Sequence, residues 1–343
     1  MTAATTQASS PIRIVRLAHM RYRHADIAQT QEFLEDFGMH LAYKEGNDRF
    51  YFAGDGPDPF VYVAEAVGLS LIIGLLASRS IGYIDLRVQG ERSEFLGGTF
   101  LVETREDLER ASQLIPGATS LQSAGPAGGF MVTFRDPDGI PCNLAWGLAE
   151  KAVNEETTIP LVNFPTAKPR RGEFISLISD FQRAYDFYTK HFNLKATDLL
   201  TAPDGSYVAG FMHIDRGEEW VDHHTFFFST NSRRVGPHHC SYEVHDSDIQ
   251  AIGHDWLLRK GYTPSWGIGR HILGSQVFDY WYTPDDFMVE HYSDGDLVNC
   301  HTETGLLPAA DEALAIWGPA VPEGFMSALP CKKKGVPHEL VQL

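Results

Sequence analysis

Cysteine is scarce in this sequence and widely spaced. The 343 residues contain four cysteines, none of them in a C-x-x-C pair: Cys142, Cys240, Cys300 and Cys331. Zinc knuckles and disulfide frameworks need cysteines in close pairs or dense sets. Neither kind of site is therefore expected.

Basic residues are also in short supply. Lysine and arginine total 28 against 45 aspartates and glutamates, which gives a formal net charge of −17. Binding to a phosphate backbone depends on clustered cations. We therefore expect no nucleic acid partner.

Long apolar runs and export signals are missing. The longest uncharged apolar stretch lies between Glu65 and Arg79, shorter than the roughly 18 to 20 residues that cross a bilayer. The first residues lack a basic segment followed by an apolar one, and no Asn-x-Ser/Thr acceptor occurs. These absences favour a cytoplasmic protein with no membrane partner.

The chain is long enough for two domains. At 43% apolar content, its 343 residues fit two units of about 150 residues each. We predict an N-terminal module over 12–150, a proline-containing linker over 151–170, a second module over 171–298 and a tail over 299–343.

Both predicted modules alternate helix-like and strand-like segments. Three-and-four spacing and capping residues predict helices over 26–37, 106–114, 180–191 and 247–260. Runs of β-branched and aromatic residues predict strands over 49–54, 60–66, 174–179, 241–246 and 276–282. This order favours an α+β fold of β-rich modules with covering helices, and not a doubly wound parallel sheet.

The two modules also resemble each other. Phe33-Leu34 follows His19 at the same offset at which Phe187-Tyr188 follows Glu173. A strand predicted over 84–88 would correspond to the one beginning at 241. Near each end, a D-P-D-G or T-P-D-D loop precedes a polar residue, Asn143 or Glu290. An internal repeat indicates duplicated architecture.

Common catalytic motifs are absent, but polar residues with chemistry cluster in the second module. No P-loop, H-E-x-x-H, G-x-S-x-G or G-x-G-x-x-G occurs, whereas this region holds His223-His224, His238-His239, His271, Tyr280 and Glu290-His291. Histidine is typical of metal and proton-transfer sites. Because side chains alternate along a strand, we expect only one histidine of each doublet to face inward.

Glu290 has apolar neighbours before it, Met288 and Val289. A buried carboxylate needs a cation, and a metal ion is a suitable one. The alternative is that Glu290 reaches water and that the histidines are ordinary core or surface residues.

The order of these residues resembles that of the type I extradiol ring-cleaving dioxygenases, within the vicinal oxygen chelate superfamily. The matching sequence is a helix ending in Phe-Tyr, then His-His-Thr, His-His-x-x-x-Glu-Val, Gly-Arg-His, Tyr and Pro-x-x-x-x-Val-Glu. The resemblance extends over 12–298 and is strongest over 171–296. It implies two modules, each a pair of βαβββ repeats, with one non-haem Fe(II) in the second. Two histidines and a carboxylate would hold the iron, leaving positions for a catecholate and O2.

The resemblance also implies roles for single residues. His239 matches the family's second histidine ligand and Glu290 its carboxylate ligand. His224 matches the acid/base histidine, His271 a histidine that contacts the substrate, and Tyr280 a tyrosine that hydrogen-bonds it.

Glu173 stands where the family has its first histidine ligand, so the implied metal set is Glu173, His239 and Glu290. A second carboxylate lowers the charge of the centre, which weakens catecholate binding and favours ferric iron. Fe(II) is the expected metal, and Mn, Zn, Mg or no metal are the alternatives. The matching positions of the first module, His19, Tyr83 and Asn143, do not make a full ligand set.

Three functions remain open. The first is an extradiol-type dioxygenase that cleaves a catechol-like aromatic diol with O2. The second is a redox-neutral isomerase, lyase or cyclase on a phenolic intermediate, with Glu173 as base. The third is a non-catalytic protein that binds an aromatic ligand. Family resemblance also favours a homo-oligomer.

Overall fold

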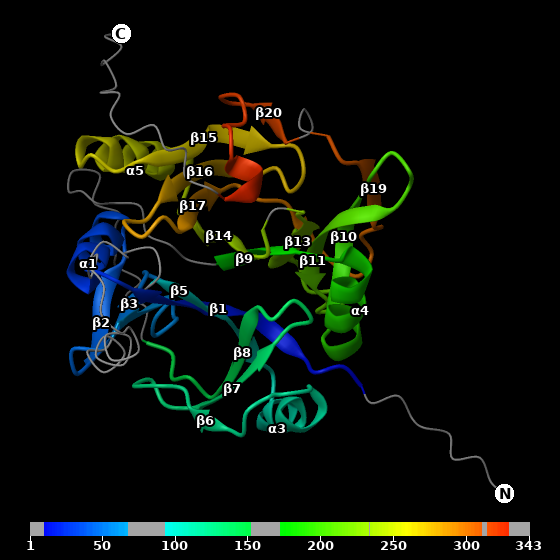
Figure 1. The fold of residues 1–343 in the computed structure, drawn as a ribbon, viewed down its shortest axis with the longest axis horizontal. Helices are drawn as coiled ribbons and strands as arrows, with labels where there is room; N and C mark the ends of the chain where they lie inside the picture. Colours follow the sequence, from blue (N-terminus) through cyan, green and yellow to red (C-terminus); the bar gives the residue numbers. More distant parts are fainter. Residues whose placement is uncertain (1–9, 68–92, 152–171, 233, 311–313, 329–343) are drawn as a thin grey trace, which may run out of the picture.

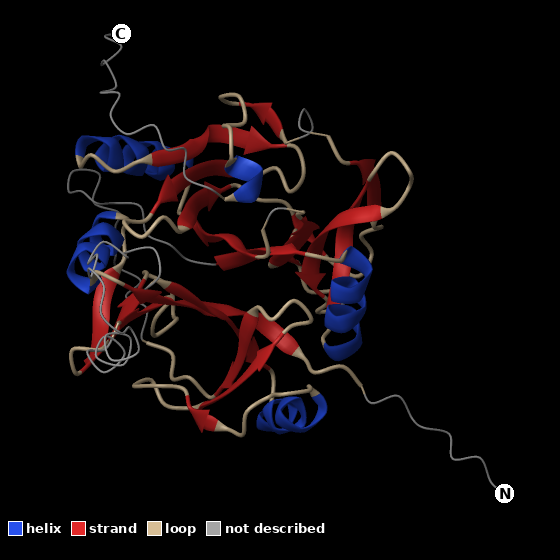
Figure 2. Cartoon of the chain, in the orientation of Figure 1, coloured by secondary structure: helices blue, strands red, loops and turns tan. Residues whose placement is uncertain are grey.

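The computed structural model describes residues 10–67, 93–151, 172–232, 234–310 and 314–328. Two large β-sheets lie one above the other in Figure 1, and Figure 2 shows the helices at their outer sides. The predicted linker, apart from Lys151, and the strand predicted over 84–88 lie outside the described residues. No described helix is long and apolar enough to cross a membrane.

The first sheet has eight strands in the order β2-β3-β4-β1-β5-β8-β7-β6. β1 and β5 pair antiparallel at its centre and join two βαβββ units, as expected. The elements of these units are β1 (Ile14–His24), α1 (Ile27–Asp36), β2 (His40–Glu45), β3 (Arg49–Ala53), β4 (Tyr62–Ala66), β5 (Glu94–Val102), α3 (Arg105–Leu114), β6 (Gln122–Ser123), β7 (Phe130–Arg135) and β8 (Pro141–Trp146).

The second sheet has ten strands in the order β19-β10-β11-β13-β9-β14-β17-β16-β15-β20. Its two βαβββ units meet where β9 and β14 pair antiparallel. They contain β9 (Gly172–Ile178), α4 (Phe181–His191), β10 (Leu194–Thr201), β11 (Tyr207–Ile214), β13 (Phe226–Thr230), β14 (Gly236–Glu243), α5 (Ser247–Arg259), β15 (Pro264–His271), β16 (Val277–Tyr282) and β17 (Met288–Ser293). β12 (Val221–Asp222) and β18 (Leu297–Val298) form a separate pair.

Residues beyond 298, expected as a tail, add strands to both edges of the second sheet. β19 (Gly305–Pro308) pairs with β10, and β20 (Ala315–Trp317) pairs with β15. A short 3-10 helix, η3 (Phe325–Ser327), follows.

The helices begin where the sequence predicts, because each has a side chain that caps its first turn. Asp26, Thr104, Asp180 and Asp246 each accept a hydrogen bond from a backbone N–H of the following turn. Such a cap satisfies donors that otherwise have no partner within the helix, and it stabilises by about 1 kcal/mol.

Strand pairing aligns the two modules position by position. Three neighbouring positions correspond: His19, Thr99 and Asn143 in the first sheet, and Glu173, Ser241 and Glu290 in the second. β5 is therefore the counterpart of β14, and the proposed correspondence with Tyr83 is wrong. The position of His239 is occupied in the first sheet by Gly97, which has no side chain to bind a metal.

The two sheets share one apolar core. The rings of Phe95 and Phe174 lie 5.3 Å apart, and those of Tyr22 and Phe287 lie 4.6 Å apart. The hydroxyl of Tyr22 also donates to the sulfur of Cys240 at 3.4 Å. Burying one aromatic side chain stabilises by about 1.5–3 kcal/mol, so these contacts fix one module against the other.

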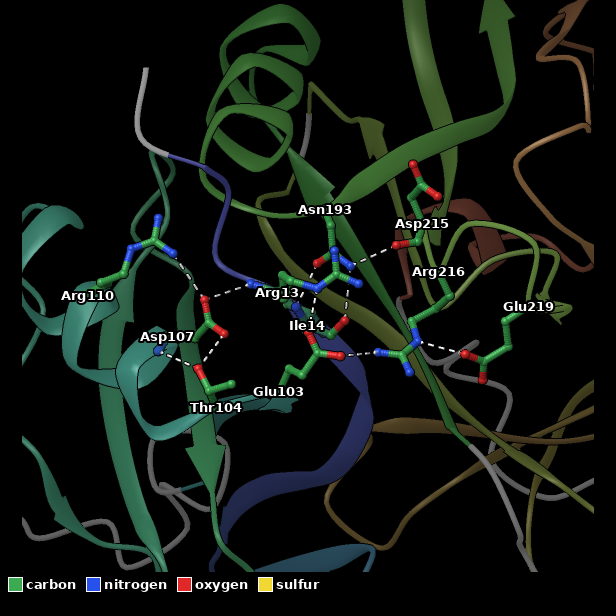
Figure 3. A network of polar contacts seen from close by, with 10 residues as sticks. All are labelled: Arg13, Ile14, Glu103, Thr104, Asp107, Arg110, Asn193, Asp215, Arg216 and Glu219. Atoms are coloured by element: carbon green, nitrogen blue, oxygen red, sulfur yellow. Dashed lines mark hydrogen bonds and ion pairs between the residues drawn. The ribbon is translucent and has the colours of Figure 1, made fainter. Parts of the chain in front are cut away.

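A polar seam continues this contact at the surface (Figure 3). The side chain of Asn193 accepts from the backbone N–H of Ile14 at 2.6 Å and donates to its carbonyl at 3.1 Å. Glu103 accepts from Arg13 of the first module and from Arg216 of the second. The start of β1 is thereby bonded to both modules.

Candidate active site

A cavity of about 310 Å³ lies on the face of the second sheet that points away from the first. Successive side chains along the adjacent strands β9, β14 and β17 point to opposite faces of this sheet. Phe174, Cys240 and Val289 belong to the shared core. Their chain neighbours Glu173, His239 and Glu290 line the cavity, together with His224, His271 and Tyr280. All six residues expected at the site are thus brought to one cavity.

Glu173 is buried and held at both oxygens. The side-chain amide of Gln276 donates to Oε1, and Nε2 of His224 lies 3.2 Å from Oε2. Burial, followed by the charges of Glu290 and Asp222, raises the pKa of Glu173 well above its ordinary value. In the absence of a cation, burial therefore favours the protonated form of the Glu173 carboxyl.

Glu290 has one oxygen bonded and one free. The hydroxyl of Ser241 donates to Oε2 at 2.5 Å, while Oε1 is buried and has no hydrogen-bond partner among the described residues. Burial raises the pKa of this carboxyl. A buried carboxylate oxygen without a partner is costly unless a cation binds it.

The hydrogen bonds of His238 and His239 fix the position of the proton on His239. Nε2 of His238 lies 2.7 Å from the carbonyl oxygen of Phe325, so it carries a proton and donates it. Burial lowers the pKa of both histidines well below the ordinary value, so each ring carries one proton. Nδ1 of His238 then accepts from Nδ1 of His239 at 2.6 Å. This leaves the lone pair of His239 on Nε2, 3.4 Å from Oε2 of Glu290.

These donors suit a divalent metal ion. An imidazole lone pair faces a carboxylate, the second nitrogen of the ring is hydrogen-bonded, and a further carboxylate oxygen is free, as metal sites require. Among the residues that the structure describes, no three His, Cys, Asp or Glu side chains already converge on one point. The nearest approaches are those of Nε2 of His224 to Oε2 of Glu173, at 3.2 Å, and of Nε2 of His239 to Oε2 of Glu290, at 3.4 Å.

His271 and Tyr280 form a second ordered pair. Nδ1 of His271 donates to the carbonyl of Leu314 at 2.8 Å, so its Nε2 accepts from the Tyr280 hydroxyl at 2.8 Å. The pKa of Tyr280 is raised well above its ordinary value by burial and by Glu290. The phenol therefore stays protonated, with an oxygen available to a bound ligand.

The expectation that one histidine of each doublet faces the site is wrong for the second doublet. His238 and His239 both line the cavity, whereas of the first doublet only His224 does, although His223 is buried as well. The pairing of β14 with β9 shifts by one residue between Pro237 and His239, so His238 is an extra residue in the strand. Such a bulge breaks the alternation of faces.

Sequence reasoning missed the residues that support the site. Gln276 precedes β16 and contacts Glu173 across 103 residues, and no local pattern indicates such a bond. Leu314 and Phe325 come from the expected tail. Ser241 could have been found, because it lies two residues after His239 on the same face of the predicted strand.

Comparison with known proteins identifies similar enzymes. The chain is similar to metapyrocatechase 2 of Cupriavidus necator, with 34% identity over 160 residues, 46% of this chain and 47% of the relative. It is also similar to biphenyl-2,3-diol 1,2-dioxygenase of Paraburkholderia xenovorans, with 28% identity over 167 residues, 47% of this chain and 53% of the relative. The matches thus span about half the length of these curated relatives.

Solved structures extend the similarity in fold to nearly the whole chain. Homoprotocatechuate 2,3-dioxygenase from Arthrobacter globiformis superposes with a TM-score of 0.74 at 18% identity, covering 92% of each chain. The Mn(II)-bound glyoxalase from Novosphingobium aromaticivorans gives 0.72 at 20% identity, covering 93% of this chain and 95% of the other. The α+β, two-module vicinal oxygen chelate fold is therefore confirmed.

The family model of the Glyoxalase/Bleomycin resistance protein/Dioxygenase superfamily matches residues 170–291. This segment carries β9, β14 and most of β17, and it includes every cavity residue assigned from the sequence, from Glu173 to Glu290. The resemblance of this part of the chain to the superfamily and to its extradiol dioxygenases, indicated by the order of the site residues, is confirmed.

Proposed function

We propose that the protein is a metal-dependent extradiol-type dioxygenase that cleaves the ring of a catechol-like aromatic diol with O2. The observation that carries the proposal is the lone pair of His239 facing Glu290, in a cavity that also holds His224, His271 and Tyr280. The similarity to metapyrocatechase 2 and biphenyl-2,3-diol 1,2-dioxygenase supports it.

In this proposal Glu173, His239 and Glu290 would hold the metal, with Fe(II) as the expected ion. A bound Fe(II) would supply Lewis acidity and open positions for a diol and O2. A cation would also lower the pKa of Glu173 and remove its proton, because an opposite charge favours the carboxylate.

The remaining residues act on the substrate. The Tyr280 hydroxyl, oriented by His271, lies at the cavity wall and its oxygen can accept a hydrogen bond from a diol hydroxyl. Burial lowers the pKa of His224 to about 4, so its imidazole is neutral at pH 7 and can take a proton from a substrate hydroxyl.

The lining of the cavity supports an uncharged substrate. No lysine or arginine is among the described residues of its wall, which is largely apolar through side chains such as Leu200, Val208, Phe227, Ile272 and Leu307. A carboxylate on the ring would be buried there without a cation, at a cost of several kcal/mol. We therefore propose a neutral, apolar aromatic diol. A homo-oligomer in the cytoplasm, with no nucleic acid or membrane partner, completes the proposal.

The test combines metal analysis with oxygen uptake. The protein is purified anaerobically, loaded with Fe(II) and measured by mass spectrometry, then mixed with catechol, 3-phenylcatechol and a carboxylated catechol. One iron per chain, with oxygen uptake greatest for the uncharged diols, is the expected result. An iron-loaded protein that consumes no oxygen with any of them would refute ring cleavage.

A second candidate is redox-neutral isomerase, lyase or cyclase chemistry on a phenolic compound. The observation in its favour is that Glu173 is bonded to Gln276 and His224, which would suit a carboxyl that exchanges a proton with a ligand. Turnover under anaerobic conditions would distinguish it from the dioxygenase. Stoichiometric uptake of a diol without any product would instead indicate a binding protein.

A further inference from the structure

His224 stands at the inner end of a hydrogen-bonded chain that leads away from the cavity. Its Nδ1 lies 3.2 Å from Nδ1 of His223, and Nε2 of His223 lies 2.8 Å from Oδ2 of Asp198. All three residues are buried, but only His224 lines the cavity.

The carboxylate at the outer end sets the order of the protons. A carboxylate only accepts hydrogen bonds, so Nε2 of His223 carries a proton and donates it to Asp198. In a neutral His223 the other nitrogen, Nδ1, is an acceptor and must receive a proton from Nδ1 of His224. A neutral His224 then has its lone pair on Nε2, the nitrogen that lies toward Glu173 in the cavity wall.

Two further bonds hold His223 in this orientation. The hydroxyl of Thr197 donates to its carbonyl oxygen at 2.7 Å, and its backbone N–H donates to the carbonyl of Asp296 at 3.0 Å. Asp198, next to Thr197 in β10, thus faces a histidine whose backbone is already fixed.

The other doublet shows the same arrangement with a different acceptor. His238 orients His239 through the same pair of Nδ1 atoms, but its own Nε2 donates to a neutral carbonyl, that of Phe325. A charged acceptor lies behind His224 and a neutral one behind His239. A carboxylate stabilises a ring that becomes positively charged, whereas a carbonyl suffices for a ring that stays neutral.

We propose that Asp198 and His223 are positioning residues that keep the proton of His224 on Nδ1 and its lone pair, on Nε2, available to the cavity. The inference rests on the proposed function for its catalytic consequence. There, Nε2 of His224 takes the proton of a diol hydroxyl: the O–H bond breaks, its electron pair stays on oxygen, and the proton ends on Nε2.

The proton order can be measured without any turnover. Full-length protein with ¹⁵N-labelled histidine is studied by NMR, and the His224 signals are identified by their loss in His224→Phe. We expect a protonated Nδ1 and an unprotonated Nε2 in the wild type. Asp198→Asn should mix the two tautomers, because an amide can donate as well as accept. His223→Phe, which removes the neighbour, should do the same.

His254→Gln is the matched control. His254, in α5, also bonds a buried aspartate, Asp279, at 2.8 Å, but it does not line the cavity, so its loss should leave the His224 signals in place. A wild-type Nε2 that bears the proton would overturn the proposal, as would Asp198→Asn with unchanged His224 signals.

Kinetics test the catalytic consequence separately. With a diol that the wild type cleaves, Asp198→Asn should lower kcat by at least about tenfold with little change in KM, because the base and not the binding surface is altered. An unchanged kcat would overturn this consequence. If no diol is cleaved by the wild type, the proposed function fails, while the nitrogen signals still decide the proton order.

Discussion

His238 donates a hydrogen bond to the carbonyl oxygen of Phe325, so the last described helix is bonded to the strand that carries His239. The ring of Phe325 also packs 4.8 Å from that of Trp266 and 5.0 Å from that of Tyr280. Residues far beyond the matched module therefore contribute to the cavity wall and to the orientation of a candidate ligand.

Phe325→Ala should weaken the packing of this part of the cavity wall. Loss of a buried phenyl ring costs about 3–5 kcal/mol locally, and the diol would lose part of its apolar wall. We expect a KM at least several-fold higher, measured by oxygen uptake, and easier proteolysis near residue 325. Trp317→Ala, at an exposed ring of β20, is the control and should change neither. Identical KM values for Phe325→Ala and wild type would contradict a role in substrate binding.

His239→Ala and Glu290→Ala should each abolish stoichiometric metal binding, because each removes a proposed metal ligand. Ser241→Ala removes only the hydrogen bond to Glu290, and affinity should fall by about 10- to 100-fold. Metal content after dialysis, determined by mass spectrometry, measures this series. Cys240→Ser, on the opposite face of the same strand, should retain the metal. Full metal content in Glu290→Ala would remove Glu290 from the ligand set.

His224→Phe should keep the metal and lose turnover. The substitution removes the proposed base while leaving His239 and Glu290 in place, and general acid–base catalysis contributes about 10²- to 10⁴-fold. Metal content and oxygen uptake are measured on the same sample. Metal loss in this variant would show that His224 is itself a ligand, which its 3.2 Å contact with Glu173 would allow.

Glu173→His should raise Fe(II) affinity and increase catechol cleavage. With the metal bound, a neutral histidine in place of a carboxylate would raise the charge of the proposed iron centre by one. Iron titration followed by oxygen uptake checks both effects. Gln276→Ala, which removes only the partner of Glu173, separates the effect of the new ligand from that of the lost hydrogen bond. A metal-free, inactive Glu173→His protein would mean that position 173 no longer faces a metal.

The contact between the modules should depend on pH in the acid range. Nδ1 of His24 lies 2.6 Å from Oδ2 of Asp285, in the other module. Burial alone would raise the pKa of Asp285, but the hydrogen bond and charge of His24 outweigh it and lower the pKa below the ordinary value. Because the folded pKa is depressed, this carboxylate stabilises the fold above about pH 4 and the stabilisation is lost as pH falls further.

Asp285→Asn therefore should lower the unfolding free energy at pH 7 by about 1–2 kcal/mol. Thermal unfolding from pH 7 down to pH 3 should show the wild-type and variant curves converging. A difference that stays constant across this range would show that the carboxylate charge does not matter.

The sequence was most informative where the determinants are local. Capping residues placed the helices within one or two residues, and the order of His224, His239, His271, Tyr280 and Glu290 brought all of them to one cavity. Local chain geometry and strand pairing are enough to fix such features.

Long-range pairing and register were not accessible in the same way. The bulge at His238 shifts the strand by one residue, and only the pairing of β14 with β9 reveals it. Gln276, which precedes β16, bonds Glu173, and Asp198 of β10 bonds His223 behind the site, through contacts that leave no periodic pattern. The counterpart of β14 in the first module was misplaced because similar short apolar runs occur at several positions.

The alternation of faces along β9, β14 and β17 has a consequence for the first module. Glu173, His239 and Glu290 each adjoin a residue whose side chain is locked into packing with the other sheet. The first module, which has Gly97 at the position of His239, thus still affects how accurately the second module holds these groups. Enlarging or shrinking a core side chain such as Phe95, which packs against Phe174, would therefore shift donor spacing in a cavity that it does not line.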